Sequence, residues 1–491
     1  MSVSFGDGRD GNLTVLSGTF NINTDPSGSR SYADGIAYKV TSNPTTIFIT
    51  IGISPNGIDI GDKVLLISLQ GSTSDYDDVG NWEVFDVIDI QPTFVQVDRV
   101  PSKSYDGTSW ANQKVVMQRI PQYENVTVSG TGEIIASTWD RLSTTPAGSA
   151  GYRTATISMF VNDTLTNYNG INVAQKGYYG GQSGVDGSSA YGWPGESTGR
   201  INTSRDTDGT AKPEGGGAAA YYPGSGGAGG GHGTAGANGT PNADVSGMTF
   251  YGGEAFGDEE LYRMNFGGGG GGAGEGPNGR TGVGGGAGGG IVYIHARSMY
   301  SYGSITANGQ NGPNGVKIYD HNSGGGGGGG AGGTIYIKTY DIWGIGSSIT
   351  AIKGTGGLRD ASAAGSKNGG NGGEGLVRID YTRANGANWP NDSVINSIID
   401  PDPYDARLPY GWYYFSGYTK FLYDVPASGV QLYVYRRDTG AYMGNTTSSG
   451  NGAFEITTTY SGEHFLVSLD TPIDGNYNDL VIGKVIPAYQ T

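Results

Sequence analysis

The sequence contains no cysteine, few charges, only four histidines, and no apolar run long enough to cross a membrane as a helix. Disulfides and cysteine-based zinc sites are therefore excluded, and the histidines are not paired at the spacing of metal ligands. The chain does not open with a basic and then apolar signal segment, so export by the Sec route is not indicated. With 29 basic against 45 acidic residues, the formal net charge of −16 disfavours nucleic acid as a partner. We expect no metal, no cofactor and no membrane insertion.

Sequence stretches with the 3.6-residue apolar period of an amphipathic helix are missing as well. The chain instead contains 93 glycines and 33 tyrosines, a composition that favours β-structure. Within the first 127 residues, five alternating segments separated by turn residues are predicted strands, at 45–53, 63–69, 82–90, 93–100 and 114–120. We therefore predict an all-β fold that begins with a β-barrel or β-sandwich domain over residues 1–127.

Residues 128–385 form a second predicted domain, which is rich in glycine and contains an internal repeat. Residues 292–294 (VYI) match residues 335–337 (IYI) at an offset of 43, and Ile379 follows Ile337 after a further 42. Residues 156–177 are a diverged earlier copy. Each copy carries an apolar strand that it cannot bury alone, so we expect the copies to stack on one another.

The glycine runs precede the repeat strands in a constant relation, as Gly324–Gly330 precedes the segment TIYIK at 334–338. A flexible linker would not repeat in register with strands, so we predict that these runs are ordered. They lack the Gly-X-Y period of collagen. An extended threefold helix of glycine is the remaining candidate, since chains without side chains can approach closely and exchange backbone hydrogen bonds.

Little in the sequence points to catalysis. The acidic residues at 258–260, Asp400 and Asp402 leave a glycosidase-type carboxylate pair open, because sequence spacing does not show whether two carboxyl groups converge. Matches to GxGxxG inside the glycine runs carry no weight, because a dinucleotide site needs a strand before and a helix after them. His295 aligns with Lys338 of the next repeat, which suggests an exposed strand face.

The better binding candidates are aromatic residues between the glycine runs, because aromatic side chains on rigid loops stack on sugars or grip protein loops at low entropic cost. They could equally cover the edges of the glycine core. These candidates are Tyr178, Tyr179, Tyr191, Trp193, Tyr221, Tyr222, Tyr251, Phe256 and Tyr319. The periodic tyrosines Tyr293 and Tyr336 are expected to be structural.

The alternation of polyglycine segments with loops rich in Tyr, Trp and Asn, over residues 178–373, resembles the polyglycine-helix domain of receptor-binding adhesins from the tail-fibre tips of T-even-like phages. The chain departs from that pattern in its strand repeat and in its flanking domains. After a linker at 386–407, we predict a C-terminal β-sandwich over residues 408–491. Within it, residues 430–486 resemble the β-sandwich of carboxypeptidase-regulatory-like modules, an Ig-like fold. That resemblance rests on Arg437, Thr439, Gly440, Ser448, Gly452 and Phe454.

These resemblances imply a structural protein of a phage tail or fibre, assembled in the host cytoplasm. We expect it to be a non-enzymatic adhesin whose partners are other virion proteins and a host-surface glycan or outer-membrane protein. Whether the chain forms a homo-oligomer is left open. One alternative is a purely structural decoration or fibre protein, and another is a tailspike that degrades polysaccharide.

Overall fold

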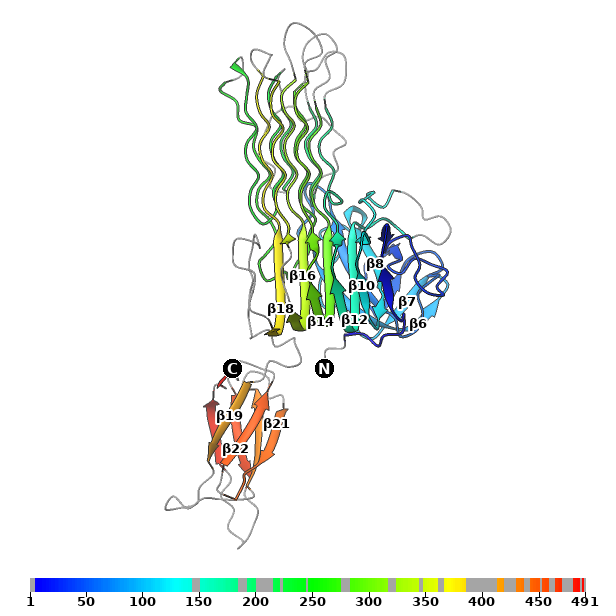
Figure 1. Ribbon diagram of the computed structural model, residues 1–491, viewed down its shortest axis with the longest axis vertical. Helices are drawn as coiled ribbons and strands as arrows, with labels where there is room; N and C mark the ends of the chain where they lie inside the picture. Colours follow the sequence, from blue (N-terminus) through cyan, green and yellow to red (C-terminus); the bar gives the residue numbers. More distant parts are fainter. Residues whose placement is uncertain are drawn as a thin grey trace.

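The computed structural model is almost entirely β-structure, as predicted (Figure 1). It describes residues 5–143, 151–183, 192–199, 215–220, 224–243, 246–274, 283–316, 324–343, 348–360, 366–385, 413–418, 430–436, 442–450, 453–458, 464–469, 480–485 and 488–489. The one helix among these residues is the short 3₁₀ helix η1 (Trp110–Asn112). None of the described helical structure has the length and hydropathy needed to span a membrane.

Two parallel sheets form a solenoid in which each turn of the chain adds one strand to each sheet. The first sheet has the order β1 (Leu13–Val15), β10 (Val126–Val128), β12 (Thr156–Asn167), β14 (Ile291–Ser301), β16 (Thr334–Trp343) and β18 (Leu376–Asn385), with β9 (Gln122–Tyr123) beside β12. The second has the order β2 (Thr19–Asn21), β11 (Glu133–Ile135), β13 (Gly170–Asn172), β15 (Ser304–Thr306) and β17 (Ile349–Thr350).

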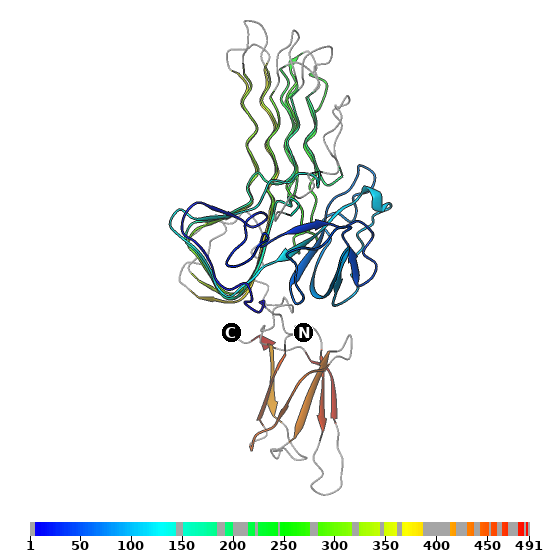
Figure 2. The ribbon, with the colours of Figure 1, turned by 90° about the vertical axis from the view of Figure 1, so that its right-hand side faces the viewer.

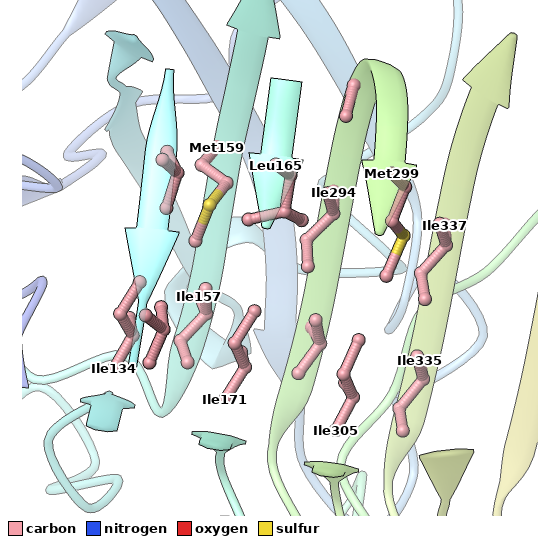
Figure 3. Close-up of a cluster of buried hydrophobic side chains, with 14 of the residues drawn as sticks. Ile134, Ile157, Met159, Leu165, Ile171, Ile294, Met299, Ile305, Ile335 and Ile337 are labelled. Atoms are coloured by element: carbon pink, nitrogen blue, oxygen red, sulfur yellow. The ribbon is translucent and has the colours of Figure 1, made fainter. Parts of the chain in front are cut away.

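The solenoid core lies between these two sheets. Alternate residues of each strand point inward, so that Ile157 and Met159 of β12 lie beside Ile294 of β14 and Ile337 of β16 (Figure 3). From the facing sheet Ile171 contributes to the same cluster. Stacking the repeats thus buries an apolar face that a single repeat would leave exposed.

The register of the sheets confirms the predicted repeat. Val292 pairs with Ile335 and Ile337 with Ile379, the offsets of 43 and 42 found in the sequence. The diverged copy at 156–177 pairs with the next copy in the same way, since Ile157 pairs with Val292. The stacking expected from the apolar strands is therefore confirmed.

A six-stranded antiparallel sheet is inserted between β2 and β9, and we call it the β-domain. Its order is β3 (Ala37–Lys39), β8 (Lys114–Ile120), β5 (Lys63–Gln70), β6 (Trp82–Gln91), β7 (Phe94–Val97) and β4 (Phe48–Thr50). The N–H of Thr41, just after β3, donates to the carbonyl of Thr50 in β4, which joins the two ends of the sheet. Strands β1 and β2 belong to the solenoid, so the first turn of the solenoid lies on the N-terminal side of the predicted boundary at residue 127.

The β-domain packs against the outer face of the first solenoid sheet (Figure 2). Strand β5 is buried on both sides, with Leu66 inside the β-domain and Leu65 against the solenoid. His295 and Lys338 do align across β14 and β16, but the expectation that they are exposed is wrong. Their exposed fractions are only 3% and 7%, because this insertion covers the face on which they lie.

Glycine-rich segments extend beyond one end of the solenoid strands as a set of side-by-side extended chains, which we call the glycine bundle (Figure 1). Residues 324–333 lie inside it and are buried throughout. The amides of Gly326, Gly329 and Gly332 donate to the carbonyls of Lys367, Gly370 and Gly373. Every third residue thus donates to the same neighbouring segment, and three residues per turn is the period of an extended helix of the polyproline II type.

Residues 324–333 form backbone hydrogen bonds with six neighbouring segments in all. Their other amides donate to the segments 307–313 and 268–271, again at intervals of three. Their carbonyls accept from three more segments, at 227–230, 286–289 and 354–357. Backbone hydrogen bonds therefore replace side-chain burial, and the prediction that Gly324–Gly330 is an ordered run rather than a linker is confirmed.

Near the C-terminus, two antiparallel sheets share a small apolar cluster that includes Val434 and Ile456. One sheet has the order β22 (Ala453–Thr458), β19 (Tyr413–Tyr418) and β25 (Ala488–Tyr489). The other has the order β21 (Tyr442–Thr447), β20 (Gln431–Arg436), β23 (His464–Leu469) and β24 (Leu480–Val485). The predicted linker at 386–407 lies outside the described residues, as do Arg437, Thr439, Gly440 and Gly452 of the resemblance motif.

Candidate functional site

Tyr178, the first of the predicted binding residues, is a structural residue. It is fully buried, its hydroxyl donates to the carbonyl of Leu69 at 2.5 Å, and its ring packs edge-on against Phe266. Burial, with a smaller contribution from the nearby Glu196 carboxylate, raises the pKa of Tyr178 well above its usual range, so the hydroxyl remains a donor. Tyr178 therefore joins the β-domain to the foot of the glycine bundle.

Three further candidates are half-buried. Tyr179 lies beneath the guanidinium of Arg141, and Trp193 forms backbone hydrogen bonds within the bundle. The ring of Phe256 packs against His232 with ring centroids 4.9 Å apart. These residues cover the edge of the glycine core, which was the alternative interpretation of the aromatic set.

Tyr251 alone among the described aromatic candidates is well exposed, at 44%. The remaining four, Tyr191, Tyr221, Tyr222 and Tyr319, lie outside the described residues. The described structure therefore does not bring the predicted aromatic set together into one site.

Two of the three acidic residues at 258–260 have structural partners. Asp258 accepts hydrogen bonds from the backbone N–H groups of Tyr262 and Arg263, and Glu260 forms an ion pair with Arg378. Asp400 and Asp402 lie outside the described residues. Among the residues that the structure describes, no three His, Asp or Glu side chains gather as a metal site would require.

A cavity on the flank of the glycine bundle is the better candidate for a binding site, and we call it the asparagine groove. Its volume is about 710 Å³, and it is lined by residues of three neighbouring segments. The lining residues are Asn311, Gly312, Pro313, Asn314, Thr355, Gly356, Leu358, Asn368, Gly369 and Asn371.

The segment 351–359 forms the centre of the groove and shows why asparagine recurs around it. The N–H of Gly354 donates inward to the carbonyl of Gly330, as in the interior of the bundle. The next amide, of Thr355, donates to Oδ1 of Asn311 at 2.8 Å, and the amide of Gly356 donates to Oδ1 of Asn371 at 2.8 Å. The side-chain oxygens therefore serve as acceptors on the two outer sides of this segment.

The pattern continues along the groove with the same period of three. Asn308 and Asn314 accept from the amides of Ile352 and Leu358, and Asn368 accepts from the amide of Arg359. Because such a helix rises about 3.1 Å per residue, successive asparagines along one segment lie about 9 Å apart. Because each Oδ1 is engaged with the backbone, the NH₂ group of each carboxamide is left to donate to a ligand.

The rim of the groove adds one ion pair and one apolar side chain. Lys353 Nζ lies 2.7 Å from a carboxylate oxygen of Glu374. Leu358, at 60% exposure, is the large apolar residue of the groove. The arrangement offers neutral hydrogen-bond donors in a row beside a patch of hydrocarbon, and it holds no pair of carboxylates at its centre.

The sequence contained a signal for this groove that the search for aromatic residues missed. Residues 308–315 read NGQNGPNG, and residues 368–375 read NGGNGGEG. Asparagine or glutamate therefore recurs at every third position within a glycine-rich run. In a threefold helix, residues three apart lie on the same side, so this spacing places one row of polar side chains along each segment.

No family model matches the sequence, and no curated protein matches it. Among solved structures, the tailspike of Pseudomonas phage phi297 is 11% identical, with 76% of this chain and 58% of that chain covered and a TM-score of 0.17. The tailspike of Acinetobacter baumannii bacteriophage AP22, solved in complex with A. baumannii capsular saccharide, is 10% identical, with 95% and 82% covered and a TM-score of 0.16. This chain thus spans less than two thirds of the phi297 tailspike, and scores this low do not establish a common fold.

Proposed function

We propose that this chain is a receptor-binding protein of a phage tail, which attaches to a host-surface glycan without cleaving it. The observation that carries the proposal is the asparagine groove, a row of carboxamide donors held on a bundle whose backbone is hydrogen-bonded on every side. A polysaccharide offers hydroxyl groups at regular intervals, and these can accept from a regular row of NH₂ groups.

The rigidity of the bundle supports binding. A flexible loop loses conformational entropy when it closes on a ligand, and this cost weakens affinity. The side chains of Asn311 and Asn371 are already held by hydrogen bonds of 2.8 Å to backbone amides. The donors are therefore in place before the ligand arrives, and Leu358 offers hydrocarbon to the C–H face of a sugar ring.

The chemistry of the groove supports attachment over cleavage. Hydrolysis of a glycosidic bond normally requires a pair of carboxyl groups on either side of the bond. None of the residues that line the groove is an aspartate or a glutamate, and Glu374 on its rim is paired with Lys353. We therefore propose binding without reaction, with the virion as the location of the protein.

Attachment is tested with purified full-length chain. We expect it to bind cells of the phage host and to reduce phage adsorption in competition. The double variant N311D/N371D keeps the oxygen acceptors but removes the NH₂ donors, so it should fold normally and lose at least tenfold in affinity, the equivalent of about 1.4 kcal/mol. The control N56A changes an exposed asparagine in the β-domain and should bind like the wild type.

Three results would overturn this proposal. If the wild type neither binds nor competes, the protein is a structural component of the virion. If the double variant binds as well as the wild type, the groove is not the site. If capsule or lipopolysaccharide yields shorter products on incubation with the protein, the protein is an enzyme.

A further inference from the structure

The asparagine groove has hydrogen-bond acceptors on its floor as well as donors on its walls. We call the segment 351–359 the floor, and the segments 308–315 and 368–375 the walls. The floor is an extended helix with three residues per turn, so its carbonyls point in three directions about 120° apart. Two of these directions lead to the walls, and the third leads away from the bundle.

The floor carbonyls that face the walls are engaged. The carbonyl of Thr355 accepts from the N–H of Gly312 on one wall. The carbonyl of Gly354 accepts from the N–H of Gly372 on the other wall. The carbonyl of Gly356, in the third direction, accepts no hydrogen bond from any residue that the structure describes. Since Gly356 lines the groove, its oxygen is an acceptor that a ligand can reach.

The side chains of the floor limit what can reach this oxygen. A Cβ atom added at Gly354 would lie 2.0 Å from a carbonyl oxygen of one wall, and one added at Gly356 would lie 2.1 Å from a carbonyl oxygen of the other. Side chains of the floor therefore have only the outward direction left, where Thr355 and Leu358 are exposed. A further backbone packed on the floor would meet their Cβ atoms at a similarly short distance. The floor thus admits a small group between these side chains and excludes a polypeptide chain.

Three features of the groove define the group that fits beside Gly356. The carbonyl requires a donor, and within the bundle that donor is the N–H of a secondary amide, as with Gly312. Leu358, at 60% exposure, offers hydrocarbon to an apolar group next to the donor. The lining residues are all uncharged, so a charged group would lose hydration there without gaining a partner of opposite charge. An acetamido group, which is an uncharged N–H donor that carries a methyl group, meets all three requirements.

We propose that the asparagine groove selects glycans with 2-acetamido sugars, whose amide N–H donates to the carbonyl of Gly356 and whose methyl group packs on Leu358. This inference rests on the proposed function, in which the NH₂ groups of Asn311 and Asn371 hold the sugar hydroxyls on either side. In an extended chain of equatorially linked pyranoses, alternate units turn the same face to one side. Every second acetamido group therefore meets the floor, where outward carbonyls recur at every third residue, about 9 Å apart.

The selection is tested with two oligosaccharides that differ only in one substituent of each sugar. Chitohexaose carries a 2-acetamido group where cellohexaose carries a hydroxyl. We expect the purified full-length chain, in calorimetric titrations, to bind chitohexaose about tenfold more tightly than cellohexaose. L358A removes the apolar contact of the methyl group, so it should narrow the ratio of the two Kd values about fourfold, the worth of one buried methyl group.

Two variants locate the binding. N311D/N371D should weaken the binding of chitohexaose about tenfold, and the control N56A should leave it unchanged. The inference is overturned if cellohexaose binds as tightly as chitohexaose, if neither binds, or if N311D/N371D keeps the wild-type affinity for chitohexaose. It is also overturned if a peptide of Pro-Gly-Gly repeats binds the groove more tightly than chitohexaose, because the floor would then serve a polypeptide.

Failure of this inference differs from failure of the proposed function. Attachment to host cells, and its loss in N311D/N371D, are measured without any oligosaccharide. Equal binding of the two oligosaccharides together with attachment that depends on Asn311 and Asn371 would remove only the selection for acetamido groups. Absence of attachment would instead overturn the proposed function.

Discussion

The side-chain oxygen of Asn311 accepts a hydrogen bond of 2.8 Å from the backbone N–H of Thr355, which lies 44 residues further along the chain. In the interior of the glycine bundle the equivalent acceptor is a backbone carbonyl, as with Gly354 and Gly330. Asparagine thus completes the hydrogen bonding of an outer segment and, by the same bond, fixes a donor group on the surface. The same side chain therefore serves the stability of the bundle and the binding proposed above.

Two substitutions at Asn311 separate these roles. N311A removes the acceptor of the Thr355 amide and should lower the free energy of unfolding by about 1 kcal/mol. N311D retains an oxygen acceptor, so thermal unfolding should begin at or near the wild-type temperature. Equal loss of stability in both variants would contradict the assignment of Oδ1 as the structural atom.

Gly327→Val should severely destabilise the bundle. A Cβ atom at this position would lie 1.9 Å from the carbonyl oxygen of Gly284. The Gly327 backbone cannot move away without breaking its hydrogen bonds to Pro313 and Gly357. We expect a loss of roughly 3 kcal/mol or more, measured as a large drop in melting temperature or failure to fold. The control is Gly247→Val, since nothing lies within 4 Å of a Cβ added at Gly247. An unchanged melting temperature for Gly327→Val would mean that the run is slack in solution.

The solenoid could be predicted from the sequence because its signal is local and repeated. The offset that aligns residues 292–294 with 335–337 is the offset at which β14 and β16 pair. The glycine runs were predictable for a related reason, since their constant distance from the strands excludes a linker. In both cases a period in the sequence corresponds directly to a translation in the structure.

The burial of His295 could not be predicted in the same way. It depends on residues distant in sequence, because Phe5, which precedes β1, and Phe160 of β12 pack against the imidazole, and the β-domain covers the same face of β14 at Tyr293. Comparison within the repeat shows only that His295 and Lys338 share a face, and not what lies against it. The groove was missed because its asparagines lie on two separate segments, on either side of a third segment that carries no aromatic or acidic residue.

Tyr178→Phe tests whether the first predicted aromatic candidate has any role in binding. Loss of the hydroxyl leaves the buried carbonyl of Leu69 without this donor, which should cost about 1 to 2 kcal/mol. Because Tyr178 is fully buried, attachment to cells at a temperature where the variant is folded should be unchanged. Reduced attachment without loss of stability would restore Tyr178 as a binding residue.

His232 should make the stability of the bundle depend on pH. Its ring is fully buried beside Phe256, and Nδ1 lies 2.8 Å from the carbonyl oxygen of Gly332. Burial lowers the pKa of His232 to about 4, against an unfolded value near 6.5, although the hydrogen bond to Gly332 acts in the opposite direction. The unfolded chain therefore binds the proton more tightly, and this contribution to stability is complete above pH 6.5 and falls as the pH is lowered towards 4.

The free energy of unfolding, measured by urea denaturation between pH 7 and pH 4, should thus fall with pH more steeply in the wild type than in His232→Gln. The difference in slope, integrated over this interval, should amount to roughly 3 kcal/mol. Burial also lowers the pKa of His295, which adds a fall of the same sign, but it does so in both proteins and cancels from the comparison. Parallel curves for the two proteins would show that the imidazole of His232 is accessible to protons in the folded state. The packing of the ring between Phe256 and the end of the glycine bundle would then be wrong.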